Sequence, residues 1–147
     1  MFPYKIISNY DDYNIITFKS LIKSRIWGGH VYKISKTRIN KGIELLKDKK
    51  IFNLVKSEIH KDWQESHLLS ESKIIQEDLK HTIRISFLIL DIPINGITPI
   101  EIDTYSRSYS FIEGHHRLLA LKYLKCKYIP IYFSGSVDIL EEFKVIK

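Results

Sequence analysis

The sequence has few of the features that staple small proteins together or attach them to membranes. Cys126 is the only cysteine among 147 residues, so an intrachain disulfide is excluded and we expect a reducing compartment. No apolar run is long enough to span a bilayer, and residues 1–5 lack the charged start and long apolar run of a signal peptide. We therefore expect a soluble, cytoplasmic protein with no membrane partner.

Several common catalytic motifs are also missing. The sequence contains no phosphate loop of the Walker or Rossmann type and no G-x-S-x-G elbow for a serine nucleophile. The spacing of His30, His60, His67 and His81 matches no short metal-ligand motif, so we expect no metal site in the protein itself. Acidic residues that could form a metal-dependent nuclease site are sparse, and this function ranks last among our hypotheses.

The composition is that of one globular domain. Hydrophobic residues make up 44% of the chain and aromatic residues 12%, which separates it from disordered sequences. A chain of this length can bury a core without disulfides or structural metals. We found no internal repeat and no low-complexity tract, so residues 1–147 are interpreted as a single domain.

Positive charge is concentrated in one part of the chain. The net charge is +6, and the stretch from Lys19 to Lys61 has twelve Lys or Arg residues against three acidic ones. Such a segment either contacts an anionic partner such as DNA or RNA or forms a solvated face. The candidate nucleic-acid contacts are Lys33, Lys36, Arg38, Lys41, Lys49 and Lys50.

Hydrophobic periodicity predicts most elements of the first hundred residues. Strands are expected over 4–7, 13–18 and 31–34, and a short helix or turn over 19–26. Thr37 is the expected N-cap of a helical pattern that reaches Ile59 and is interrupted at 47–50. A further helix is expected over 73–88, although its tail, 83–87, also fits a strand. Pro93 and Gly96 predict a turn over 91–96.

The most organised stretch runs from Arg107 to Gly135. Residues 109–113 alternate between apolar and polar, which predicts a strand with one buried face. The pattern breaks at Gly114 and continues with the helical spacing of Leu118, Leu121 and Leu124. A second strand is expected over 128–133, and a short closing helix over 137–143. This strand–turn–helix–strand unit predicts an α/β (α+β) fold, a small mixed sheet flanked by helices.

A polar cluster, Glu113-Gly114-His115-His116-Arg117, lies where the first strand of this unit becomes the helix. The first turn of a helix has unpaired N–H groups and a partial positive charge, which favour anions and especially phosphates. Gly114 allows close approach of a ligand, Arg117 can grip two oxygens, and the histidines can donate hydrogen bonds or transfer protons. The alternative is an ordinary solvated turn.

The segment 112–121, followed by Tyr128-Ile129-Pro130-Ile131, resembles the signature of the ParB/sulfiredoxin superfamily. In that superfamily an acidic-Gly-His-x-Arg or similar turn leads into an Ala-containing helix and an "IPI" strand. Residues 97–103 resemble the preceding "Pro-Ile-x-Val" strand. The resemblance covers about 95–135, and residues 1–90 match poorly and form an N-terminal extension.

The resemblance implies nucleotide binding at this turn. Members bind CTP or ATP with Mg2+, and some transfer phosphate to a small substrate. By position, Gly114, His115, His116 and Arg117 would hold the phosphates, and Glu113 and His115 would be the catalytic residues. The family's kinases have a small hydroxyl residue where this chain has His116, and partition-type turns have more arginine. Little chain follows the unit to form the helix-turn-helix domain of a partition protein.

Cys126 is a further candidate nucleophile because it lies between two lysines that would lower its pKa, although a small, partly buried residue before a strand is the simpler interpretation. Sulfiredoxins carry their reactive cysteine in the turn, where this chain has His115, so sulfinic-acid reduction is not expected. The leading hypothesis is an ATP- or CTP-dependent phosphotransferase or nucleotide hydrolase. The alternative is a non-enzymatic module that binds nucleic acid through the basic 33–61 segment.

Overall fold

A computed structural model describes residues 2–8, 13–24, 34–58, 80–106, 109–135 and 143–146. These ranges form an α+β fold, a small mixed sheet with helices, as the sequence predicts. Lys33, most of the expected strand at 31–34, the start of the expected helix at 73–88 and most of that at 137–143 lie outside the described residues.

The sheet has four strands in the order β1-β4-β2-β3. Strand β1 (Asn14–Thr17) is antiparallel to β4 (Tyr128–Gly135), β4 is parallel to β2 (Ile100–Ser106), and β2 is antiparallel to β3 (Tyr109–Glu113). The segment around Ile6 adds one isolated bridge to Ile97 in place of the expected strand at 4–7. The unit predicted from residues 109 to 133 is therefore confirmed, with β2 placed between its two strands.

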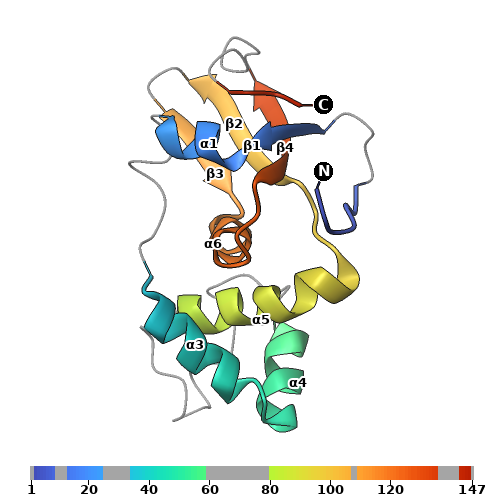
Figure 1. The fold of residues 1–147 in the computed structure, drawn as a ribbon, viewed down its shortest axis with the longest axis vertical. Helices are drawn as coiled ribbons and strands as arrows, with labels where there is room; N and C mark the ends of the chain where they lie inside the picture. Colours follow the sequence, from blue (N-terminus) through green and yellow to red (C-terminus); the bar gives the residue numbers. More distant parts are fainter. Residues whose placement is uncertain are drawn as a thin grey trace.

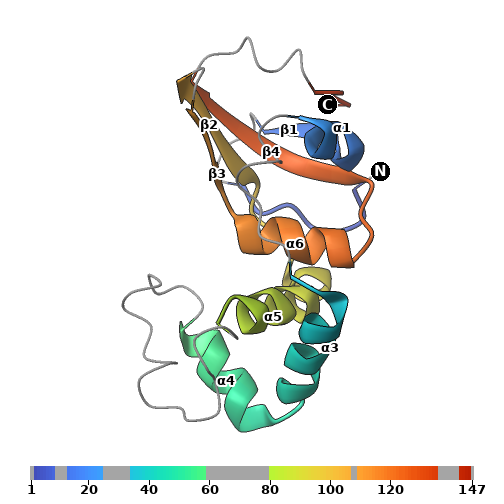
Figure 2. The ribbon, with the colours of Figure 1, turned by 90° about the vertical axis from the view of Figure 1, so that its left-hand side faces the viewer.

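Helices α6, α5, α3 and α4 form successive layers on one side of the sheet (Figures 1 and 2). Helix α6 (His115–Tyr123) lies against the sheet, and α5 (Lys80–Asn95) packs on α6. Helices α3 (Lys36–Leu45) and α4 (Lys49–Glu58) pack in turn on α5. Helix α6 is central because it has four consecutive buried apolar residues: Leu118, Leu119, Ala120 and Leu121.

Two groups of buried side chains hold these layers together. The larger one joins the sheet to α6 and α5 through residues such as Ile16, Ile102 and Ile131, each with no exposed surface. The smaller one lies between α4 and α5 and includes Val55 and Phe87. At roughly 25 cal/mol per Å2 of apolar surface, each fully buried Ile or Leu contributes about 2 kcal/mol relative to exposure. The sheet and the helical layers therefore share α5 as a common support.

Short polar residues set the helix starts. Thr17 caps α1 (Phe18–Lys23) by accepting a hydrogen bond from the backbone N–H of Ser20. Helix α3 begins two residues earlier than predicted, because Ser35 rather than Thr37 is its N-cap and accepts from the N–H of Arg38. The expected interruption is confirmed, since Asp48 accepts from the N–H of Lys50 where α4 begins.

The prediction of a turn over 91–96 is wrong, as is the strand alternative over 83–87. Helix α5 continues to Asn95 with Pro93 inside its last turn. The burial of Ile89 and Ile92 in the core favours this extra turn, and Asn95 donates a side-chain hydrogen bond to Asp91. The helix ends at Gly96, whose φ of +89° suits glycine.

Helices α3 and α5 approach closely at Gly42. The buried Ser86 hydroxyl donates to the carbonyl of Ile39 on α3 and to that of Thr82 on its own helix. A Cβ at position 42 would overlap the Ser86 hydroxyl oxygen and lie 3.0 Å from the Ser86 Cβ, a tighter contact than nine in ten real Cβ atoms make. Glycine at this position therefore sets the distance at which the two helices cross.

Among the helices that the structure describes, none combines the length and apolar character needed to cross a bilayer.

Candidate phosphate-binding site at the start of α6

Gly114 connects β3 to α6 in a left-handed conformation, with φ of 110° and ψ of 33°. This conformation is open to glycine and costly for other residues, so it explains why the strand pattern and the helix pattern meet at this residue. Gly114 provides no side-chain cap for α6. The first N–H groups of α6 therefore lie at the carboxyl end of β3 with no capping side chain from position 114, an arrangement that suits an anion.

Arg117 links the first turn of α6 to the entrance of β2. Its Nη1 atom donates to the Thr98 carbonyl at 2.8 Å, to the Pro99 carbonyl at 2.9 Å and to the Thr98 hydroxyl. Its guanidinium group also lies over Gly114, because a Cβ there would be 2.6 Å from Nη2. Arg117 is thus part of the scaffold as well as a candidate phosphate contact, since its Nη1 atom is already bonded to Thr98 and Pro99.

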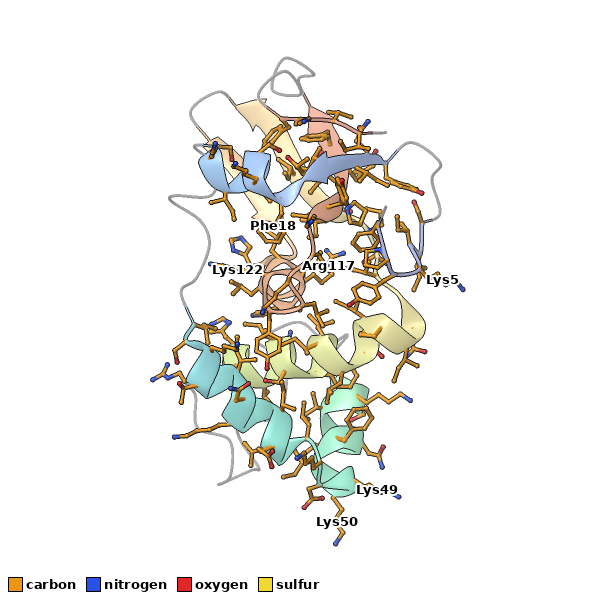
Figure 3. All side chains as sticks on the ribbon, in the orientation of Figure 1. Lys5, Phe18, Lys49, Lys50, Arg117 and Lys122 are labelled. Carbon is orange, nitrogen blue, oxygen red and sulfur yellow. The ribbon has the colours of Figure 1, made fainter. Side chains whose placement is uncertain are left out.

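A cavity of about 290 Å3 opens beside this arginine. Figure 3 shows Arg117 extending from α6 on the side where the N-terminal segment passes. The residues that line the cavity come from that segment, from the β2 entrance and from β4: Ile7, Ser8, Thr98, Pro99, Glu101, Arg117 and Tyr132. This volume is at the lower end of the roughly 300–1,000 Å3 typical of ligand pockets. It therefore fits a phosphate group better than a whole nucleotide.

The other predicted residues of the cluster take different positions. His115 is half-buried and does not line this cavity. His116 turns towards α5, where its Nε2 atom lies 2.8 Å from Nδ1 of His81. Glu113 ends β3, and the register of the antiparallel pair places it directly opposite Glu101. The structure therefore brings Gly114 and Arg117 together and directs His116 into the helical layer.

Burial lowers the pKa of His116 to about 4, and the charges of His81, Arg84 and His115 act in the same direction. His116 is neutral at pH 7 for this reason and can share a hydrogen bond with His81. A neutral imidazole facing α5 contributes no positive charge to a phosphate at the start of α6.

Four polar residues at this cavity were not among the predicted site residues: Ser8, Thr98, Glu101 and Tyr132. Thr98 and Glu101 lie in the segment 97–103 that resembles the family's preceding strand, so the resemblance pointed to the segment without assigning them a role. Alternation along Ile100-Glu101-Ile102 places Glu101 on the face opposite the buried isoleucines. This alternation is the sequence feature from which Glu101 could have been predicted as a site residue. Tyr132 carries no comparable signal in the sequence.

The basic segment is exposed to solvent over its described part. Lys36, Arg38, Lys41, Lys49 and Lys50 are all exposed. Figure 3 shows Lys49 and Lys50 at the end of α4 that points away from the sheet. Two helices joined by the short connection 46–48 thus carry five of the six predicted nucleic-acid contacts.

Cys126 is half-buried just before β4, and burial raises the pKa of its thiol. The thiol form therefore dominates at pH 7, which argues against Cys126 as an activated nucleophile. Among the described residues, no three His, Cys, Asp or Glu side chains gather as a metal site would require.

No protein-family model matches the chain, and no curated protein and no solved structure matches it either.

Proposed function

We propose that the protein binds a nucleoside triphosphate with Mg2+ and holds its phosphates at the start of α6. The observation that carries this proposal is the left-handed Gly114, which brings the start of α6 close to a cavity lined by Arg117 and has no capping side chain of its own. The N–H groups that point out of a helix start, the helix dipole and a guanidinium group all favour the same ligand, a phosphate.

The acidic residues of the cavity region fit the cation of the nucleotide. Glu101 lines the cavity, and Glu113 lies opposite it in the β2–β3 register. Mg2+ prefers oxygen ligands, usually one or two carboxylates together with phosphate oxygens and water. On the cavity wall, the Glu101 carboxylate and the Thr98 hydroxyl would provide oxygen ligands for Mg2+. A bound Mg2+ would also offset the repulsion between Glu101 and the phosphates.

The proposed activity is phosphotransfer or nucleotide hydrolysis. It rests on the same strand–glycine–helix geometry together with the resemblance to the ParB/sulfiredoxin superfamily over residues 95–135. In this proposal Glu113, at the carboxyl end of β3, acts as general base towards the acceptor hydroxyl or water. His115 lies in the first turn of α6 but not on the cavity wall, so the proposal gives it no direct contact with the phosphate.

Replacing Glu101 tests nucleotide binding more cleanly than replacing Arg117, because Arg117 also holds Thr98 and Pro99. We expect titration calorimetry with ATP, CTP and GTP to give one preferred nucleotide. Its affinity in Mg2+ should fall about tenfold or more in Glu101→Gln, as expected for the loss of an ion-binding carboxylate. Without Mg2+ the variant and the wild-type protein should bind equally weakly.

The matched control for this experiment is Asp103→Asn. It makes the same chemical change two residues further along β2 and outside the cavity, so nucleotide affinity should not change. If none of the three nucleotides binds the wild-type protein at millimolar concentration, the nucleotide proposal is wrong. If Glu101→Gln and Asp103→Asn weaken binding equally, the site lies elsewhere.

The second candidate function is binding of nucleic acid by α3 and α4, and the exposure of five predicted basic residues on these helices favours it. We expect Lys49→Glu combined with Lys50→Glu to weaken duplex DNA binding at least tenfold at low salt. The slope of log K against log salt should become shallower by about 2, since each phosphate contact contributes roughly 0.9. Acidic residues at a helix start are favourable, so α4 should remain folded. Unchanged affinity and slope in a filter-binding titration would remove this candidate.

A further inference from the structure

A larger cavity, of about 600 Å3, lies at the other end of α6, between α1 and the turn that leads into β4. Its walls combine three stretches that are far apart in the sequence, namely α1, the α6–β4 turn and the segment near the C-terminus. The lining residues are Thr17, Phe18, Lys19, Ile22, Lys23, Lys122, Lys125, Cys126, Lys127, Tyr128 and Lys144. We call it the lysine cavity, and neither proposed function uses it.

The rim of the lysine cavity is strongly positive. Among the lining residues that the structure describes, six of eleven are lysines and none is acidic. All six lysines are exposed, and they come from all three stretches of the wall. Six ammonium groups around one hollow give it a positive electrostatic potential. Such a rim attracts a ligand with several negative charges.

The floor of the lysine cavity is apolar. Phe18 is 5% exposed and Ile22 is 43% exposed, and Tyr128 and Cys126 are half-buried. Figure 3 shows Phe18 pointing from α1 towards α6, with Lys122 on the same side of the helix. A simple ion such as sulfate would satisfy the lysines but leave this floor in contact with water. The ligand that matches both parts has negative groups joined to a flat apolar body.

We propose that the lysine cavity binds single-stranded nucleic acid, with phosphates on the lysines and an unstacked base against the apolar floor. Phosphates spaced along a strand suit lysines that come from three separate stretches, and every base has a face that can cover apolar and aromatic side chains. A duplex keeps its bases stacked and cannot place one in a hollow. This site is independent of the nucleotide proposed for the start of α6.

A triple charge reversal on two of the three stretches tests the proposal: Lys19→Glu on α1, with Lys122→Glu and Lys127→Glu in the stretch that leads from α6 into β4. All three side chains are exposed, so folding should be retained, and circular dichroism checks it. We expect the affinity for a fluorescent ten-nucleotide oligothymidylate to fall at least tenfold. The salt slope should become shallower by about 2, since each contact to a single strand contributes roughly 0.7. Unchanged affinity would overturn the proposal.

The variant Lys49→Glu with Lys50→Glu is the matched control, because it reverses two charges on α4 away from the lysine cavity. It should retain most of its affinity for the oligothymidylate. If it loses binding and the triple variant does not, the strand binds on α3 and α4 and the lysine cavity is excluded. Glu101→Gln should bind the strand like the wild-type protein, which separates this site from the proposed nucleotide site.

Cys126 offers a local readout, because it is the only cysteine and lines the lysine cavity. The oligothymidylate should slow alkylation of Cys126 at least threefold, and an abasic strand of the same length should protect it less. The intact strand should also compete at a concentration at least tenfold below that of thymidine monophosphate. If thymidine monophosphate protected Cys126 as well as the intact strand does, the cavity would be assigned to a free nucleotide. Equal protection by polyglutamate or anionic vesicles would show that any polyanion suffices, and either result overturns the proposal.

Discussion

Lowering the pH from 7 to 4 should destabilise the protein by about 3 kcal/mol through His116. The pKa of this residue is about 4 in the folded protein and 6.5 in its ordinary state, and one pKa unit corresponds to about 1.4 kcal/mol. Between pH 4 and pH 6.5, His116 is mostly protonated in the unfolded chain and mostly neutral in the folded protein. The free energy of unfolding contributed by His116 is therefore fully present above pH 6.5 and lost as the pH falls to 4.

Urea unfolding at pH 7, 6, 5 and 4 measures this effect, and His116→Gln isolates it. The variant loses the hydrogen bond to His81, so we expect it to be about 1 kcal/mol less stable than the wild-type protein at pH 7. Because glutamine does not titrate, its stability should fall by about 3 kcal/mol less than that of the wild-type protein on going to pH 4. At pH 4 the variant should therefore be the more stable protein.

His81→Gln is the informative second variant. It removes one of the charges that lower the pKa of His116 but leaves the burial, which is the larger cause. The pH dependence should therefore become shallower without disappearing. Parallel curves for the wild-type protein and His116→Gln would show that His116 is not the group that titrates.

The contact between His81 and His116 also shows what the sequence could not reveal. The two residues are 35 positions apart and belong to separate helices, so no local periodicity relates them. The unit from Tyr109 to Gly135 was predictable because alternation, a glycine break and a helical stripe follow each other within a few residues. The mixed sheet followed from this unit.

The last turn of α5 was mispredicted for a related reason. Pro93 and Gly96 are reliable local signals for a turn, but the burial of Ile89 and Ile92 against the core holds the helix together beyond the proline. Tertiary packing outweighed local preference here. In the same way, the location of Gly114 and Arg117 was predictable from their positions, whereas the bonds of Arg117 to Thr98 and Pro99 depend on where β2 enters the sheet.

Replacing Gly114 with alanine should lower the free energy of unfolding by about 3–5 kcal/mol. A residue with a side chain at a φ of 110° is strained by roughly 1–3 kcal/mol. The new Cβ would also lie 2.6 Å from Nη2 of Arg117 and would displace the guanidinium group from Thr98 and Pro99. Those hydrogen bonds are partly exposed, so we assign them about 2 kcal/mol in total.

A double-mutant cycle separates the two contributions. Arg117→Met alone should cost about 2 kcal/mol, and Gly114→Ala in the Arg117→Met background should cost only the backbone strain. The double variant should therefore be more stable than the sum of the single effects predicts, by about 2 kcal/mol. Gly42→Ala is the control partner, because it lies at the α3–α5 crossing and its effect should add to that of Arg117→Met within about 0.5 kcal/mol.

The sign of this coupling bears on the proposed function. If Gly114 and Arg117 are coupled, the glycine conformation and the arginine position form one rigid unit, and the first turn of α6 is held in place before any phosphate arrives. A ligand that binds such a unit does not have to order it, which raises its affinity. Simple additivity would mean that Arg117 holds the β2 entrance independently of Gly114. The guanidinium group would then be part of the scaffold, and the backbone N–H groups of α6 would have to hold the phosphates without it.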